Sequence, residues 1–308
     1  MSEGAMPAPR RVTPYAGVPT ASAGKARVEF PLTQLEIEHL VHDALFEDRA
    51  FEDLTTIATV VSDRHARARL VARSDGVLAG VPLAIAAFCV LDDKISIRVD
   101  REDGTRVHRG DIVLYLTGHA RSLLSAERVA LNFLQRLSGI ATLTRKYVEA
   151  VSGTDAKILD TRKTTPGWRA LEKHAVKSGG GVNHRMDLAS AVLIKDNHLA
   201  SLDADVALAV RRCRDYAPAG TPVQVECDNI AQVRAAIDAG ADAVLLDNMK
   251  LDQISECVRV AKGKVVTEVS GGVSLVTVRS IAETGVDRIS IGALTHSAPA
   301  LDLALDFE

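Results

Sequence analysis

The chain has 308 residues, of which 47% are hydrophobic, and a formal net charge of −3 at pH 7. That length is enough for two domains, or for one large α/β domain with an appendage, and for a sizeable buried core. The charge argues against nucleic acid as a partner, because such a surface is strongly basic. We also expect no membrane contact, since the longest weakly charged run, residues 77–91, is shorter than the roughly 20 residues of a membrane span.

The first thirty positions and the cysteines bear on the compartment. Residues 1–30 are rich in Ala, Pro and Gly without a continuous apolar run, which predicts a mobile tail rather than a secretory signal. The cysteines lack the paired spacing of zinc sites and disulfide frameworks. Ordinary reduced cysteines indicate a cytoplasmic protein. Their positions are Cys89, Cys213, Cys227 and Cys257.

Residues 31–135 alternate short helical and strand-like patterns. The apolar spacing predicts amphipathic helices at 35–46 and 126–137, and short alternating strands at 66–73 and 94–99. Glycines between them mark turns. We therefore predict a separate N-terminal α+β domain here, with residues 299–308 packing back against it.

The segment 136–298 has a different and steadier rhythm. Apolar runs that end in a polar residue or glycine recur at the length of a βα unit, with helical patterns between them at 229–240, 251–261 and 274–284. This predicts a parallel barrel or a doubly wound sheet. We favour the barrel because polar groups follow each strand, where barrel enzymes hold their sites. The runs end at Asp160, Asp196, Glu226, Asp247, Glu268 and Gly292.

Cations gather after two of these predicted strands and in the glycine-rich segment 179–185. In a chain with net negative charge, such a local excess predicts a site for an anionic ligand. A lysine at a barrel strand end, such as Lys195, is also typical of Schiff-base aldolases, which leaves that alternative open. The cations are Arg162, Lys163, His184, Arg185 and Lys195.

Carboxylates and small residues follow the later strands. Glu226 and Asp247 end neighbouring strands, and paired carboxylates of this kind suit Mg²⁺, although either could instead cap the next helix. Small residues after the last strands leave backbone N–H groups free to bind a phosphate, the alternative being plain turns. These residues are Ser270, Gly271, Gly272, Gly292, Ala293, Leu294 and Thr295.

The motifs in this order resemble those of the quinolinate phosphoribosyltransferases. These type II phosphoribosyltransferases make nicotinate mononucleotide from quinolinate and phosphoribosyl pyrophosphate, with loss of CO₂, in NAD synthesis. The resemblance covers the chain from about Asp48 to the C-terminus. It is carried by Ser125-Ala126-Glu127-Arg128 with Asn132, and by the segments 138–142, 160–167, 179–185, 193–198, 245–248, 270–272 and 292–297.

The resemblance implies a fold, an assembly and a set of roles. The fold is an N-terminal α/β sandwich domain with an incomplete parallel α/β barrel, and the assembly is a head-to-tail homodimer in which Arg121 enters the partner's site. Arg162, His184, Arg185 and Lys195 would bind the carboxylates of quinolinate, while Lys163 and Lys195 reach phosphoribosyl pyrophosphate. Glu226 and Asp247 would hold Mg²⁺, and the small loops the 5-phosphate. The catalytic set is Lys163, Lys195, Glu226 and Asp247.

Two departures and one close alternative accompany this expectation. Glu52 stands where the family often has Gly, and His174 replaces a frequent Tyr. Another ring acid, such as nicotinate, is the alternative substrate within the same chemistry. The surplus of cations favours the dicarboxylate, because a monocarboxylate leaves a desolvated cation unpaired at a cost of about 1–3 kcal/mol.

Overall fold

The computed structural model describes residues 28–308, so the predicted tail lies almost wholly outside the described residues. Of the tail, Phe30 packs edge-on against His174, with ring centroids 4.9 Å apart. No helix within the described range is both long and apolar enough to cross a membrane. All four cysteines are free, and Cys227 and Cys257 are buried.

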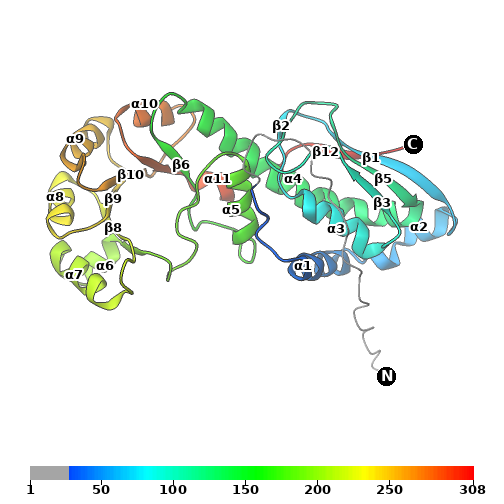
Figure 1. Cartoon of the computed structure of the whole chain (residues 1–308), viewed down its shortest axis with the longest axis horizontal. Helices are drawn as coiled ribbons and strands as arrows, with labels where there is room; N and C mark the ends of the chain where they lie inside the picture. Colours follow the sequence, from blue (N-terminus) through cyan, green and yellow to red (C-terminus); the bar gives the residue numbers. More distant parts are fainter. Residues whose placement is uncertain (1–27) are drawn as a thin grey trace, which may run out of the picture.

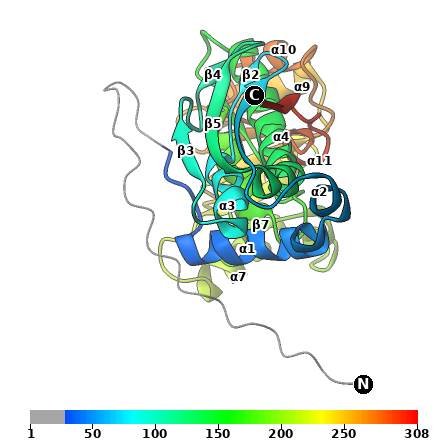
Figure 2. The same cartoon turned by 90° about the vertical axis from the view of Figure 1, so that its right-hand side faces the viewer.

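The N-terminal part is an antiparallel four-stranded sheet packed on helices (Figures 1 and 2). Its order is β12-β1-β5-β3, so the last strand of the chain pairs with the first. Helix α4 contacts β1, β5 and β12, and α3 packs beside α4. The elements are α1 (Gln34–Glu47), η1 (Ala50–Glu52), α2 (Leu54–Thr59), β1 (His65–Ala72), β2 (Gly76–Val77), α3 (Val81–Leu91), β3 (Ser96–Val99), β4 (Arg106–Val107), β5 (Ile112–His119), α4 (Ala120–Ala150) and β12 (Leu303–Phe307).

Helix α4 corrects the prediction of a helix at 126–137, because it runs from Ala120 to Ala150. Gly139 lies inside the helix for a packing reason. A Cβ there would lie 2.1 Å from the carbonyl oxygen of Pro299, so only glycine lets the C-terminal segment cross the helix. Leu301 N donates to Gln135 O at 3.0 Å along the same crossing. The predicted domain boundary at residue 135 falls within α4, and the division into domains stays a prediction.

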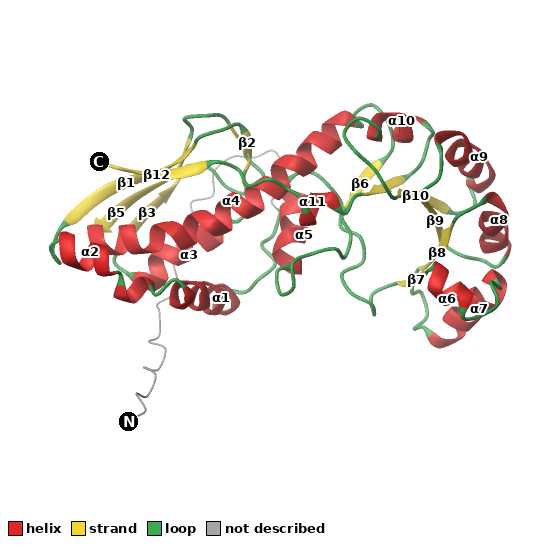
Figure 3. Cartoon of the chain, turned by 180° about the vertical axis from the view of Figure 1, so that it is seen from behind, coloured by secondary structure: helices red, strands yellow, loops and turns green. Residues whose placement is uncertain are grey.

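The rest of the chain forms a curved sheet of six parallel strands, ordered β6-β11-β10-β9-β8-β7 (Figure 3). Helices α7 to α10 lie outside the curve. Strands β6 and β7 are the two ends of the sheet, and β6 also forms a parallel bridge from Leu159 to Val182. The predicted incomplete barrel is therefore confirmed. The elements are β6 (Lys157–Leu159), α5 (Arg169–Ser178), β7 (Val192–Ile194), α6 (Asp196–Ala200), α7 (Val206–Tyr216), β8 (Val223–Cys227), α8 (Ile230–Asp238), β9 (Ala243–Asp247), α9 (Leu251–Ala261), β10 (Val266–Ser270), α10 (Val278–Glu283), β11 (Arg288–Ser290) and α11 (Ala293–His296).

The two faces of this sheet differ in chemistry. Register places Glu226, Leu245 and Glu268 side by side, so their side chains share one face, as do Asp247 and Ser270 two positions further on. The alternate positions are buried and, apart from Thr267, apolar, and they pack toward the outer helices. The barrel thus turns a polar face inward near the carboxyl ends of its strands. The apolar outer positions include Val225, Val244, Leu246, Val269 and Ile289.

Candidate active site

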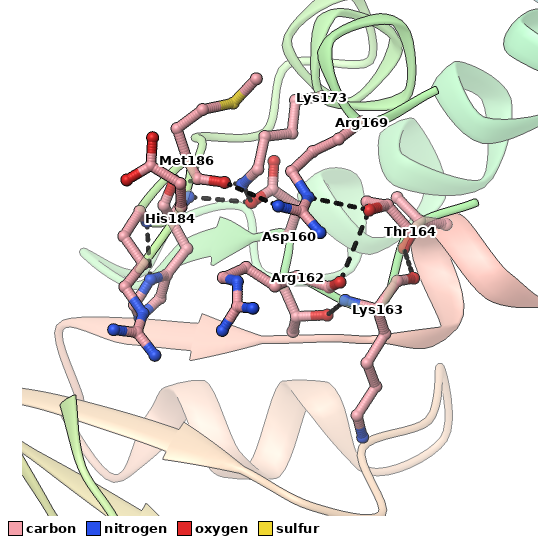
Figure 4. Close-up of polar contacts among 12 residues, drawn as sticks. Asp160, Arg162, Lys163, Thr164, Arg169, Lys173, His184 and Met186 are labelled. Carbon is pink, nitrogen blue, oxygen red and sulfur yellow. Dashed lines mark hydrogen bonds and ion pairs between the residues drawn. The ribbon is translucent and has the colours of Figure 1, made fainter. Parts of the chain in front are cut away.

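The loop that follows β6 carries Arg162 and Lys163 and is fixed by helix α5. Thr165 donates to the carboxylate of Glu172 through both its backbone N and its Oγ1, at 3.1 and 2.9 Å. Arg169 Nε donates to Thr164 Oγ1 at 3.0 Å (Figure 4). Because α5 anchors the loop twice, the Arg162 and Lys163 side chains start from a defined backbone, and they leave it in different directions.

A buried ion pair ties the glycine-rich segment to the same helix. Lys173, 2% exposed, pairs with Asp160, which is fully buried, and Lys173 Nζ also donates to His184 O at 3.1 Å. His184 N donates in turn to Asp160 Oδ1 at 2.9 Å (Figure 4). Strand β6, helix α5 and the segment before Arg185 therefore meet at one buried carboxylate.

Replacing Lys173 by Met is expected to destabilise the protein by about 3–5 kcal/mol, because Asp160 then stays buried without its partner. Lys177→Met is the matched control, since Lys177 is an exposed lysine of the same helix. It should cost less than about 1 kcal/mol. Chemical denaturation measures both changes. Similar losses in the two variants would contradict the assigned role of the buried pair.

Arg162 and Arg185 form a pair of cations without a carboxylate partner in residues 28–308. Arg185 donates to Ala191 O at 2.9 Å, and Arg162 Nε is buried without a hydrogen-bond partner. Burial, and then repulsion by Arg162, lowers the pKa of the Arg185 guanidinium. Two close, partly buried guanidinium groups of this kind favour a ligand with more than one negative charge.

His184 lies between this pair and the barrel interior. Its Nδ1 accepts from Arg185 N at 2.7 Å, and its Nε2 lies 3.3 Å from Glu268 Oε1. The other oxygen of Glu268 accepts from Gln224 Nε2 at 3.1 Å. Both nitrogens of the imidazole are thus engaged within the chain. The binding of a substrate carboxylate by His184 stays a prediction.

The acidic half of the site follows β7, β8 and β9. Lys195 Nζ lies 3.2 Å from Glu226 Oε2, and Asn248 Nδ2 donates to Asp247 Oδ2 at 2.7 Å. Burial raises the pKa of Asp247, although the Asn248 hydrogen bond and the charges of Lys195 and Lys163 oppose it. In the described part of the chain, no three His, Cys, Asp or Glu side chains group as a ready metal cage.

The predicted phosphate loops lie against these residues. Thr295 Oγ1 donates to Lys163 O at 2.7 Å, and a Cβ on Gly292 would lie 2.9 Å from Lys163 Cδ. Gly271 has φ of +90°, and a Cβ there would meet Asn248 Oδ1 at 2.1 Å. Gly271 is therefore required by its positive φ and the close approach of Asn248, whereas a side chain at Gly292 would displace the end of Lys163. The two loops stand beside Lys163 and Asp247, respectively.

Arg121 is the predicted site residue that the chain does not bring to the cluster. Its guanidinium donates to the carbonyls of Val60 and Ile57, at 2.7 and 3.1 Å, at the end of α2. Arg136, on the same helix, contacts Thr295 O and Glu172. Since α4 rises ~1.5 Å per residue, the two arginines are ~22 Å apart, beyond the reach of a side chain.

Most of the residues that hold the site in place were not predicted from the sequence, and Glu268 was identified only as a strand end. Gln224 and Glu268 share the inner face with Glu226 and Ser270, and counting back two positions from each could have found them. Lys173 and Glu172 gave no signal, because helix spacing does not distinguish a buried charge from an exposed one.

An open α/β barrel with cations and carboxylates together at its strand ends is typical of an enzyme that acts on anionic substrates. Two family descriptions match consecutive parts of the chain. The N-terminal domain of quinolinate phosphoribosyl transferase matches residues 53–138, and its C-terminal domain matches residues 140–306. The chain belongs to this family, which confirms the prediction made from its motifs.

Individual relatives agree over nearly the whole chain. A nicotinate-nucleotide pyrophosphorylase [carboxylating] of Mycobacterium leprae is 43% identical over 86% of this chain and 95% of its own. A probable nicotinate-nucleotide pyrophosphorylase [carboxylating] of Bacillus subtilis is 39% identical over 89% of this chain and 94% of its own. The solved structure of the Francisella tularensis nicotinate-nucleotide pyrophosphorylase has a TM-score of 0.85 and 39% identity, covering 91% and 99% of the two chains.

Proposed function

We propose that this chain transfers the phosphoribosyl group of phosphoribosyl pyrophosphate to quinolinate, giving nicotinate mononucleotide, pyrophosphate and CO₂ in NAD biosynthesis. The observation that carries the proposal is the Arg162–Arg185 pair, which lacks a carboxylate partner of its own among the described residues. The family's relatives carry names for the same activity.

In this proposal, the two guanidinium groups hold the two carboxylates of the ring acid. Each can form a bidentate hydrogen-bonded pair, which fixes the ring in one orientation. Lys163 and the loops 270–272 and 292–295 hold the phosphates, because their backbone lies where small residues allow close approach. Lys195 reaches both substrates from the end of β7.

The chemistry needs a site with both signs of charge. Loss of pyrophosphate from the ribose passes through an oxocarbenium-like centre, which the carboxylates of Glu226 and Asp247 can stabilise, while the cations hold the leaving group. The ring nitrogen becomes positive once it bonds to the ribose. Breaking the bond between the adjacent ring carbon and its carboxylate then releases CO₂ and leaves the electron pair on that carbon, next to the positive nitrogen. A proton then bonds to this carbon in place of the lost carboxylate.

Mg²⁺ is proposed at Glu226 and Asp247. Two carboxylates are a sufficient protein contribution, since Mg²⁺ usually takes one or two together with substrate phosphates and water. The raised pKa of Asp247 fits this role, because burial leaves its charge incompletely balanced without a further cation. When bound, the ion would neutralise charge on the departing pyrophosphate.

The same observations give less support to the two alternatives, which are nicotinate as the substrate and a Schiff-base aldolase. Nicotinate has one carboxylate and would leave one guanidinium of the pair unmatched. A Schiff-base aldolase needs the lysine amine free for attack, whereas Lys195 Nζ contacts Glu226 Oε2 at 3.2 Å.

We further propose a cytoplasmic, head-to-tail homodimer. Large apolar side chains stand exposed around the place where Arg121 binds α2, among them Leu54 at 84% and Val61 at 66% exposure. A second copy that covers this surface would bring Arg121 to the partner's cation pair. The further exposed residues there are Phe46, Phe51 and Ile57.

An assay of the purified protein tests the proposed reaction. With quinolinate, phosphoribosyl pyrophosphate and Mg²⁺, we expect nicotinate mononucleotide, pyrophosphate and CO₂ in equal amounts. Nicotinate in place of quinolinate should give little product. Nucleotide formed from nicotinate alone, or substrate trapped on Lys195 by borohydride, would favour the respective alternative.

Replacing Arg162 or Arg185 by Ala is expected to lower kcat/KM for quinolinate by at least about tenfold, because a carboxylate loses its cation. Lysine at either position should rescue poorly, since its ammonium lacks the planar fork. Arg211→Ala, on the exposed face of α7, is the matched control and should leave the kinetics unchanged. Unaltered kcat/KM in both site variants, with folding intact, would contradict the proposed substrate contacts.

A further inference from the structure

Glu268 is a buried carboxylate on the inner face of β10 that the proposed reaction does not use. It is fully buried, and its two oxygens face Gln224 Nε2 and His184 Nε2. Burial by itself raises the pKa of Glu268, but the contacts with His184, followed by Gln224 and Ser290, outweigh it and lower the pKa below its ordinary value. A charged side chain is therefore maintained inside the barrel.

The partner of Glu268, His184, has all four of its polar groups engaged. Its N donates to Asp160, its O accepts from Lys173, and its Nδ1 accepts from Arg185 N at 2.7 Å. Because a backbone N–H is always a donor, Nδ1 must carry the lone pair. The ring proton then resides on Nε2, which faces Glu268 at 3.3 Å.

We propose that Glu268 is a positioning residue that holds His184 in the Nε2–H tautomer and so fixes the main chain of Arg185 beside Arg162. In the opposite tautomer, Nδ1–H would face the N–H of Arg185 across the same short contact. Two donors repel at that distance, so the backbone would have to move and carry the guanidinium with it. The kinetic consequence rests on the proposed function, whereas the tautomer does not.

The acceptor pattern explains why a carboxylate is needed at this position. Glu268 Oε2 accepts from Gln224 Nε2, while Oε1 lies 3.3 Å from His184 Nε2 and has no hydrogen-bond partner among the described residues. A glutamine offers one acceptor oxygen in place of two. In one orientation its NH₂ group faces His184 Nε2 and favours the opposite tautomer, and in the other orientation the amide of Gln224 must turn over to pair with it. Glu268→Gln therefore keeps the size of the side chain and no longer fixes one tautomer.

Nitrogen NMR of ¹⁵N-histidine-labelled protein reads the tautomer directly. The His184 signals are identified by their loss in His184→Ala or, should that variant fail to fold, in His184→Gln. In the ligand-free wild type at neutral pH, we expect a protonated Nε2 and an unprotonated Nδ1. Glu268→Gln should show a mixture of tautomers. A wild-type ring protonated on Nδ1 would overturn the proposal.

Kinetics test whether Glu268 acts through His184. We expect Glu268→Gln to raise KM for quinolinate by at least about tenfold with KM for phosphoribosyl pyrophosphate changed less than about twofold. In a His184→Ala background, the same substitution should add less than about twofold, because residues that act as one unit are not additive. The proposal would also be overturned if the increases in KM for quinolinate in the two single variants multiplied in the double variant. A wild-type KM in Glu268→Gln would overturn it as well.

Asp103→Asn is the matched control, because Asp103 is another little-exposed carboxylate that holds a histidine, His174, at 2.8 Å, away from the barrel lining. It should lower the melting temperature without changing either KM. If the wild type fails to convert quinolinate, the proposed function fails. The NMR result then still decides the role of Glu268.

Discussion

Removal of divalent metal ions is expected to abolish the turnover of quinolinate, and added Mg²⁺ should restore it. Asp247 lies opposite Ser270 of a predicted phosphate loop, and Glu226 contacts Lys195. A polyphosphate leaving group needs more positive charge than Lys163 and Lys195 supply. Pyrophosphate release after treatment with EDTA measures the effect. Asp247→Asn should raise the Mg²⁺ concentration needed for half-maximal rate. Full activity in metal-free buffer would contradict the metal assignment.

Two inactive variants, Arg121→Ala and Lys163→Ala, are expected to regain activity when their subunits exchange. Arg121 is ~22 Å along α4 from the residue that contacts the site elements of its own chain, so we expect it to act across the proposed dimer. A mixed dimer then holds one site with both defects and one with neither. When half of the dimers are mixed, about a quarter of wild-type activity should return.

Subunit exchange is followed independently, by fluorescence transfer between labelled copies. Each variant incubated alone under the same conditions is the control and should stay inactive. If exchange is complete and the mixture stays inactive, Arg121 serves its own subunit, and the head-to-tail arrangement would be wrong.

The barrel was the part most open to prediction from sequence. Each of its six strands lies within two residues of an apolar run identified beforehand, because the outer positions, such as Val225 and Val244, must be apolar to pack against helices. The polar groups that end these runs mark the carboxyl edge of the sheet. The same sequence pattern therefore predicted both where the strands end and which residues belong to the site.

What the sequence concealed depends on contacts between distant segments. The predicted helix ended at residue 137, and nothing local indicates that Pro299 crosses α4 at Gly139. Lys173 lies in a helix whose polar letters suggest exposure, yet its charge is buried against Asp160. Glu268 was visible as a strand end, but its link to His184 requires two loops to be placed in space. Tertiary partners, rather than local propensity, decide all three.

The pairing of β12 with β1 constrains the order in which the barrel and the N-terminal sheet can fold. The strands of the barrel lie between Lys157 and Ser290 and are complete without either end of the chain. The N-terminal sheet instead joins residues more than two hundred positions apart, as in the Arg73–Asp306 pair. Non-local pairing of this kind is slow, because a long loop must close first. During synthesis, β1 therefore waits with an open edge until the final strand emerges, and a fragment cut after the barrel would keep that edge exposed to aggregation.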